Sequence, residues 1–211
     1  MSILVVLRVF DFDQTMMDTL CTDRYDFNKL NFSINNVQLA NNKSCSYVMF
    51  DDGVTIIRKG VMNIIDNAFN KFNADIALFS FGRTLHVIQH AIFLEMYYNY
   101  YFNGSLEFPN EFKFDGVIAD QISGSNIHSK KSFNYLINYG YLLWQYKQIM
   151  VVDDQAVLRW NLYSIPKNAH ILRAKRFKII NPRTFKDIEH IRKSDLHLFT
   201  VIKWMQYYFA S

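Results

Sequence analysis

The amino-acid sequence predicts an α/β fold, a doubly wound, Rossmann-like parallel sheet with helices on both faces. Two observations lead to this prediction. Short apolar runs rich in Val and Ile recur along the chain, and segments with apolar residues at helical spacing separate them. The chain has 211 residues, of which 50% are hydrophobic and 20% are charged, so it is long enough for one domain with a complete core. Only seven Gly and three Pro are present, which excludes a disordered or fibrous chain.

The individual elements follow from local patterns. Residues 3–10 are almost continuously apolar, which is typical of a strand buried on both faces. Residues 17–57 include a polar, Asn-rich stretch and a turn signal at Asp52-Gly53, and they predict a small β-hairpin flap. The rest of the chain alternates, with helices expected at 58–72, 85–98, 131–139 and 156–162, and strands at 75–79, 116–119, 148–152 and 169–172.

The last predicted element is an amphipathic C-terminal helix, or two shorter helices with a hinge near Ser194. We assign residues 1–183 to the main domain and residues 184–211 to this helix, packed on the domain or appended to it. From Ala156 onward the chain has 11 Lys and Arg against 3 Asp and Glu, a net charge of +8, whereas the first 155 residues carry −4. This asymmetry indicates either a basic surface for nucleic acid or another acidic partner, or simply a solvated helical face.

Membrane insertion and secretion are not expected. No run of about 18 apolar residues is present, and the apolar N-terminal segment is interrupted by Arg8 and lacks a cleavage site. Two cysteines, Cys21 and Cys45, are too few for a disulfide framework or a four-cysteine zinc site. We therefore expect a cytoplasmic or nuclear protein that does not bind membranes, and the sequence leaves its oligomeric state open.

Polar side chains follow three of the predicted strands. They are Asp11, Asp13 and Thr15 after the first strand, Ser80 after the second, and Asp153 and Asp154 after the third. Two lysines, Lys130 and Lys131, stand where a helix is expected to begin. Because the carboxyl ends of parallel strands form one edge of a sheet, these groups are expected to converge. Several carboxylates at one point repel one another unless a hard cation, usually Mg²⁺, binds between them.

This set of residues resembles the four motifs of the haloacid dehalogenase (HAD) superfamily. The D-x-D-x-T motif at residues 11–15 is similar to the form found in its phosphatases. The likeness extends over about residues 3–160. Its short spacing, without a large insert, is most similar to the capless members, the magnesium-dependent phosphatases and the RNA polymerase C-terminal-domain phosphatases. The resemblance implies a HAD-type sheet and a Mg²⁺-dependent phosphoric monoester hydrolase.

The resemblance also implies a role for each polar residue. Asp11 would be the nucleophile that forms an aspartyl-phosphate, and Asp13 would be the general acid and base. Ser80 and one lysine would bind the phosphoryl oxygens. The spacing to the second acidic pair favours Lys131 for that role, with Lys130 as the alternative.

The remaining roles concern the metal and the loop. Thr15 would fix the motif loop through its hydroxyl, and Arg83 would either meet a second anionic group of the substrate or lie on the surface. Asp154 would support the metal site. The Mg²⁺ ligands implied by the resemblance are the Asp11 carboxylate, the Asp13 backbone carbonyl and Asp153.

A phosphorylated protein is the expected substrate, because a site without a large cap admits a macromolecule. One alternative is a nucleic-acid 3′-phosphatase, which the basic C-terminal region would suit. A second alternative is a non-enzymatic structural protein, since large DNA viruses of insects encode nucleocapsid-assembly proteins with a similar domain, and the AT-rich composition is compatible with a viral member. The complete set of motif residues favours an enzyme.

Overall fold

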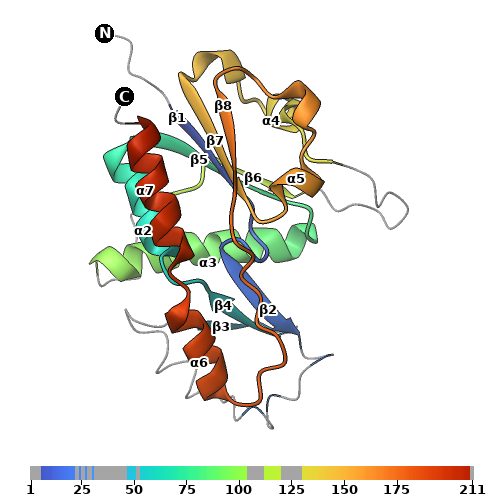
Figure 1. The fold of residues 1–211 in the computed structure, drawn as a ribbon, viewed down its shortest axis with the longest axis vertical. Coiled ribbons are helices and arrows are strands. Elements are labelled where there is room, and N and C mark those ends of the chain that lie inside the picture. The colour runs from blue at the N-terminus through green and yellow to red at the C-terminus, as the bar shows by residue number, and fades with distance from the viewer. Residues whose placement is uncertain are drawn as a thin grey trace. The chain divides into compact units, whose positions relative to one another are not determined.

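The structure, a computed structural model, describes residues 6–21, 24, 27, 30, 47–50, 53–103, 112–119 and 130–209. The chain forms two compact units, each built from two separate stretches of sequence. Met1–Phe12 and Ile65–Ala174 make the first unit, and Asp13–Ile64 and Lys175–Ser211 make the second. The first contains a five-stranded parallel sheet and the second a three-stranded antiparallel sheet (Figure 1), so the α/β prediction is confirmed.

The parallel sheet has the strand order β6-β5-β1-β7-β8 (Figure 1), with β1 at its centre. Each of its strands corresponds to one of the apolar runs. Phe10 of β1 pairs with Leu78 of β5 and with Val152 of β7, so these three strands end at nearly the same level. The strands are β1 (Val6–Phe10), β5 (Ala74–Ser80), β6 (Gly116–Ala119), β7 (Gln148–Asp153) and β8 (Ala169–Arg173).

Both faces of this sheet are buried. On one face, α4 (Phe133–Asn138) and Trp160, which directly follows α5 (Ala156–Arg159), pack against strand residues Leu7, Val9, Ala77, Phe79, Ile149 and Val151. On the other face the alternate residues Arg8, Phe10, Ile76 and Leu78 are equally buried. There the Arg8 guanidinium lies 5.3 Å from the centre of the Phe72 ring. Burial on both faces explains why β1 reads as a continuous apolar run.

The second unit contains an antiparallel sheet with the order β2-β4-β3: β2 (Met17–Cys21), β3 (Tyr47–Phe50) and β4 (Gly53–Ile57). The predicted hairpin corresponds to β3 and β4, in which Phe50 pairs with Gly53, while Asp52 lies outside the described residues. Strand β2 pairs along β4 and extends the hairpin to three strands. Ile188 of α6 (Phe185–Ser194) packs on this sheet and is fully buried.

Helix boundaries depart from the sequence pattern at several points. The segment expected at 58–72 is α2 (Val61–Asp66) followed by a π-helix, η1 (Asn67–Lys71), in which Phe72 N donates to Asn67 O. α3 (Thr84–Asn103) is longer than expected. Two short 3₁₀ helices, η2 (Leu143–Gln145) and η3 (Leu162–Ser164), were not predicted. None of the helices in the described part of the chain has both the length and the apolar character needed to cross a bilayer.

The C-terminal segment forms two helices, α6 (Phe185–Ser194) and α7 (His197–Phe209), as the hinge near Ser194 predicted. Thr184 and Asp187 form a capping box that begins α6. Asp195 separates the helices: its Oδ1 accepts a hydrogen bond of 3.0 Å from the backbone N–H of His197, and its Oδ2 pairs with Arg58 Nε at 2.8 Å. The break between the helices is therefore held by a charged side chain.

A buried carboxyl group makes the second unit sensitive to pH. Asp18 on β2 is 7% exposed, and its Oδ2 accepts a 2.7 Å hydrogen bond from Ile179 N. Burial raises the pKa of Asp18 from 3.8 to about 6, although the Ile179 N–H and the charges of Lys178 and Arg176 act in the opposite direction. Because the folded-state pKa is the higher one, the folded protein binds the proton more tightly, and stability falls as pH rises from about 4 to about 6.

We predict that Asp18→Asn stabilises the protein above pH 6, because the amide keeps an oxygen acceptor for Ile179 N and carries no charge. The difference between 3.8 and about 6 corresponds to at most about 3 kcal/mol at pH 7.5. The advantage should shrink between about pH 6 and pH 4. Urea denaturation of both proteins across this range measures it, and a constant difference at every pH would contradict the prediction.

Candidate active site

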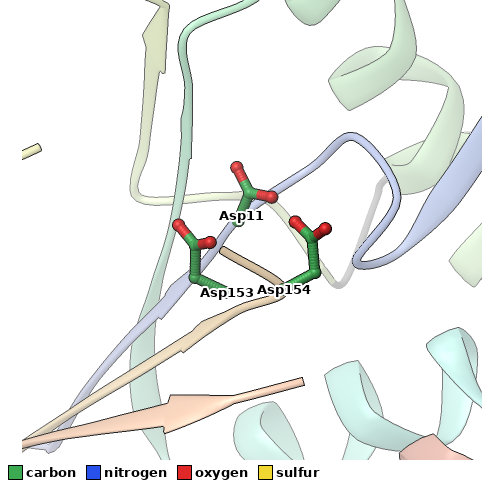
Figure 2. Close-up of side chains that lie close together, drawn as sticks. All are labelled: Asp11, Asp153 and Asp154. Atoms are coloured by element: carbon green, nitrogen blue, oxygen red, sulfur yellow. The ribbon is translucent and has the colours of Figure 1, made fainter. Parts of the chain in front are cut away.

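Three aspartates lie together where the central strands of the parallel sheet end. Asp11 follows β1, and its backbone N–H continues the ladder by donating to Val152 O at 2.8 Å. Asp153 is the last residue of β7, and Asp154 comes next. Figure 2 shows the three side chains extending to the same side, and one carboxylate oxygen from each lies within 4.8 Å of the others. The parallel register of β1 and β7 brings these residues together.

Lys131 provides the cation of this cluster. Its Nζ donates to Asp11 Oδ1 at 2.5 Å, to Asp153 Oδ2 at 2.9 Å and to the Phe79 carbonyl at 2.8 Å. The side chain is 2% exposed. Burial alone would lower the pKa of Lys131, but the charges of Asp11 and Asp153 outweigh it and raise the pKa above its ordinary value. Lys131 is therefore a buried ammonium with three acceptors, whereas Lys130 is exposed.

Asp153 is held from several directions. Its Oδ1 accepts from Gln155 N at 2.7 Å, and its Oδ2 accepts from Trp160 Nε1 at 2.9 Å in addition to Lys131. Trp160 is not among the residues that the sequence predicted for the site. The available signal was its indole N–H, which needs an acceptor when buried, close behind an acidic pair.

Trp160 also positions the backbone of Lys131. The two residues form a β-bridge, and Asn161 N donates to Lys131 O at 2.8 Å. Lys131 is thus extended and lies two residues before α4, which begins at Phe133. The prediction that the helix includes Lys131 is wrong, because pairing with Trp160 takes the place of helical hydrogen bonding.

The cluster has an excess of negative charge. Asp11, Asp153 and Asp154 are 9%, 1% and 4% exposed, and Lys131 is a cation that contacts two of them. If all four groups are ionised, their sum is −2, which is unfavourable in a buried setting. Carboxylate oxygens are the ligands that a hard divalent cation such as Mg²⁺ prefers, so the residues present fit this ion.

Ser80 and Arg83 lie along the turn that leaves β5. Ser80 is the final residue of the strand, 2% exposed, and follows the Phe79 carbonyl that Lys131 binds. Its Oγ accepts a 3.0 Å hydrogen bond from Gly82 N, which bends the chain toward α3. Arg83 directly precedes α3 and is exposed. Ser80 is thus placed at the same sheet edge as Asp11, while Arg83 has a surface position.

The rest of the D-x-D-x-T motif belongs to the second unit. Asp13 is half-buried and forms a β-bridge with Met17. Gln14 has a φ of 61°, in the left-handed region that marks a tight turn. Thr15 is fully buried, and its carbonyl accepts from Arg58 Nη1 at 2.9 Å. The motif therefore leaves β1 and turns directly into β2.

Comparisons with known proteins give little beyond this geometry. No protein-family model matches the chain, and no curated protein matches it. One solved structure that matches is a variant of the fission yeast RNA polymerase II CTD phosphatase Fcp1 bound to beryllium fluoride, with 13% sequence identity and a TM-score of 0.48. Another is a structure of Fcp1, an essential RNA polymerase II CTD phosphatase, with 13% sequence identity and a TM-score of 0.47. Each match covers 94% of this chain but 50% and 49% of the other, so the chain spans about half their length.

We predict that Lys131→Met lowers the free energy of unfolding by about 3–5 kcal/mol at pH 7.5, because it leaves buried carboxylates without their cation. Lys130→Met is the matched control, since it removes the same charge from an exposed neighbour, and it should change stability by less than about 0.5 kcal/mol. Urea denaturation without divalent ions measures both. Equal effects of the two substitutions would contradict the arrangement described for Lys131.

Proposed function

We propose that this chain is a Mg²⁺-dependent phosphatase that acts through an aspartyl-phosphate on Asp11. The observation that carries the proposal is the contact of the Lys131 ammonium with Asp11 and Asp153 at the carboxyl ends of β1 and β7. A nucleophilic carboxylate, a fixed cation and further carboxylates for a metal are the groups that phosphoryl transfer needs at one point. The D-x-D-x-T resemblance supports the same assignment.

In the first step a carboxylate oxygen of Asp11 attacks the phosphorus atom of a phosphate monoester. The bond between phosphorus and the ester oxygen breaks as the new bond to Asp11 forms. Lys131 lies within hydrogen-bond distance of Asp11, so its ammonium is placed to stabilise negative charge on the phosphoryl oxygens. We assign to Asp13 the proton that the leaving oxygen receives, and to the Ser80 hydroxyl a hydrogen bond to the phosphoryl group.

In the second step Asp13, now ionised, removes a proton from a water molecule. The water oxygen attacks phosphorus, the bond to Asp11 breaks, and inorganic phosphate leaves. Asp11 is regenerated as a carboxylate and Asp13 as an acid, so the cycle closes with one water consumed for each ester cleaved. The backbone carbonyl of Thr15 accepts from Arg58 Nη1, which supports a fixed conformation for the loop that carries Asp13, and the role of the Thr15 hydroxyl stays a prediction.

Mg²⁺, when bound, neutralises charge on the phosphoryl group during transfer. We propose that Asp11 and Asp154 are its side-chain ligands, with the Asp13 carbonyl as a further ligand. Asp153 contributes mainly by holding Lys131, because both of its oxygens already accept hydrogen bonds. The resemblance implied that Asp153 binds Mg²⁺ directly, with Asp154 in support. In this proposal Asp154 is the ligand instead.

The proposed substrate is a phosphorylated protein. The likeness of the motif spacing to that of capless family members supports access of a macromolecular phosphate in this proposal. A small aryl phosphate should also be hydrolysed, since the reacting groups themselves need only the phosphate monoester.

We expect Asp11→Asn to reduce turnover of p-nitrophenyl phosphate by about a thousandfold or more, because an amide is not a nucleophile toward phosphorus. Asp13→Asn should lose turnover but still form some phosphorylated protein, which mass spectrometry would detect as an added phosphoryl group. Circular dichroism shows whether both variants stay folded. Near-normal activity of a folded Asp11→Asn variant would exclude Asp11 as the nucleophile.

Because the proposal assigns metal binding to Asp154 and the positioning of Lys131 to Asp153, substitutions of these two residues should have different effects. Asp154→Asn should raise the Mg²⁺ concentration for half-maximal activity about tenfold with little loss of stability. Asp153→Asn should instead lower the free energy of unfolding, because Lys131 loses one of its two carboxylates. Activity titrations with Mg²⁺ and urea denaturation measure the two effects. Reversal of this pattern would make Asp153 the ligand.

A further inference from the structure

A basic cavity of about 460 Å³ lies within the second unit, apart from the aspartate cluster in sequence. It is formed by the segment that follows β8 and by the hinge between α6 and α7. Its volume lies in the range typical of small-ligand sites. The residues that define its character are Lys175, Arg176, Lys178, Asp195, Leu196 and His197.

The charge in this cavity is strongly positive. Lys175, Arg176 and Lys178 are all exposed at its wall. The carboxylate of Asp195 is already engaged, since Arg58 Nε binds its Oδ2 at 2.8 Å and Arg58 Nη2 binds its Oδ1 at 3.3 Å. Lys175, Arg176 and Lys178 thus outnumber Asp195, the acidic side chain of the lining, while Asp18, which interacts with the charges of Lys178 and Arg176, is not part of the lining.

The pKa of His197 reflects the same positively charged surroundings. Burial and the charge of Arg58 lower its pKa, Lys175 lowers it further, and only Asp195 acts in the opposite direction. The backbone at the start of α7 adds to this field, because the N-terminal end of a helix carries partial positive charge. An anion entering the cavity would meet cationic side chains and the start of a helix.

We propose that this cavity binds a phosphate monoester group on a phosphorylated protein, at a position other than the one hydrolysed. Lys175 and Lys178 provide the point charges, and the guanidinium of Arg176 provides planar donors suited to phosphate oxygens. The inference rests on the proposed function in one respect only, that the bound phosphoprotein is also the substrate.

The shape of the site favours a phosphoprotein over nucleic acid. Single-stranded nucleic acid is bound along an extended groove with aromatic rings on which bases stack. Here the cations are gathered around one cavity, and Phe177, which is the single Phe, Tyr or Trp residue of the lining, is 2% exposed and so offers no stacking surface. A single compact anion with adjoining peptide matches this arrangement better.

The cavity wall is connected to the D-x-D-x-T loop within the same unit. The Nε of Arg176 donates to the side-chain oxygen of Gln14, and Phe177 N donates to Gln14 O at 2.7 Å. Gln14 lies next to Asp13, the proposed acid and base. A phosphate bound beside Arg176 is thus held by the segment that also fixes the motif loop, which would tether the phosphoprotein near that loop.

The test measures binding separately from catalysis. A fluorescein-labelled mixture of 12-residue peptides with one fixed phosphoserine is titrated with the full chain in EDTA, and fluorescence anisotropy is followed. The Lys175→Ala/Lys178→Ala variant should bind about tenfold or more weakly, through loss of two charge-assisted contacts. Its turnover of p-nitrophenyl phosphate should equal that of the wild type.

The matched control is Lys186→Ala/Lys203→Ala, which removes two exposed lysines of the same unit that do not line the cavity. It should change affinity by less than about twofold, because exposed charges at a distance are screened. Equal weakening in both variants would overturn the proposal, and so would equal binding of the unphosphorylated peptides or no binding at all.

Two further outcomes distinguish this proposal from a nucleic-acid site and from the phosphatase proposal. If a labelled 12-nucleotide single strand binds more tightly than the peptides and loses more affinity in the cavity variant, the site is for nucleic acid and the proposal fails. If the wild type hydrolyses no aryl phosphate but its peptide affinity still depends on Lys175 and Lys178, the binding site stands and only the phosphatase proposal fails.

Discussion

The buried ammonium of Lys131 is the interaction on which the site depends. It joins the end of β1, through Asp11, to the end of β7, through Asp153, and to β5 through the Phe79 carbonyl. Three strands that the sheet already aligns are thereby fixed at one edge. A lysine at 2% exposure is tolerable only because each of its N–H donors has an oxygen acceptor and two of these acceptors are charged.

Even with Lys131 present, the three carboxylates and this one ammonium sum to a negative charge if all four groups are ionised. Among the described residues, the Lys131 ammonium contacts Asp11 and Asp153, and one oxygen from each of these and from Asp154 lies within 4.8 Å of the others, an arrangement that is compatible with a hard divalent ion. Asp153 and Trp160 set the position of Lys131, whereas Asp11 and Asp154 present carboxylates to the remaining space in our proposal. In this proposal the two adjacent aspartates therefore have different roles: Asp153 holds Lys131, and Asp154 binds the metal.

The chain divides between Phe12 and Asp13, inside the D-x-D-x-T motif. Asp11 belongs to the unit with the parallel sheet, and Asp13 belongs to the unit with the antiparallel sheet and the two C-terminal helices. Arg58 links the motif loop to the hinge before α7 through Thr15 and Asp195, and Arg176 links it to the basic cavity through Gln14. The second unit therefore supports the motif loop with residues from distant parts of the sequence.

The sequence by itself determined the strands and their common edge, because continuous apolar runs specify buried parallel strands, and Asp11, Ser80 and Asp153 follow them directly. The spacing to the second acidic pair favoured Lys131 over the chemically identical Lys130, but only the tertiary structure, through the bridge to Trp160, decided that Lys131 is the buried one. The tertiary structure also decided the basic cavity, because Lys175 and His197 lie 22 residues apart and meet only through chain folding. Local periodicity reports which residues are buried, but long-range contacts select their partners.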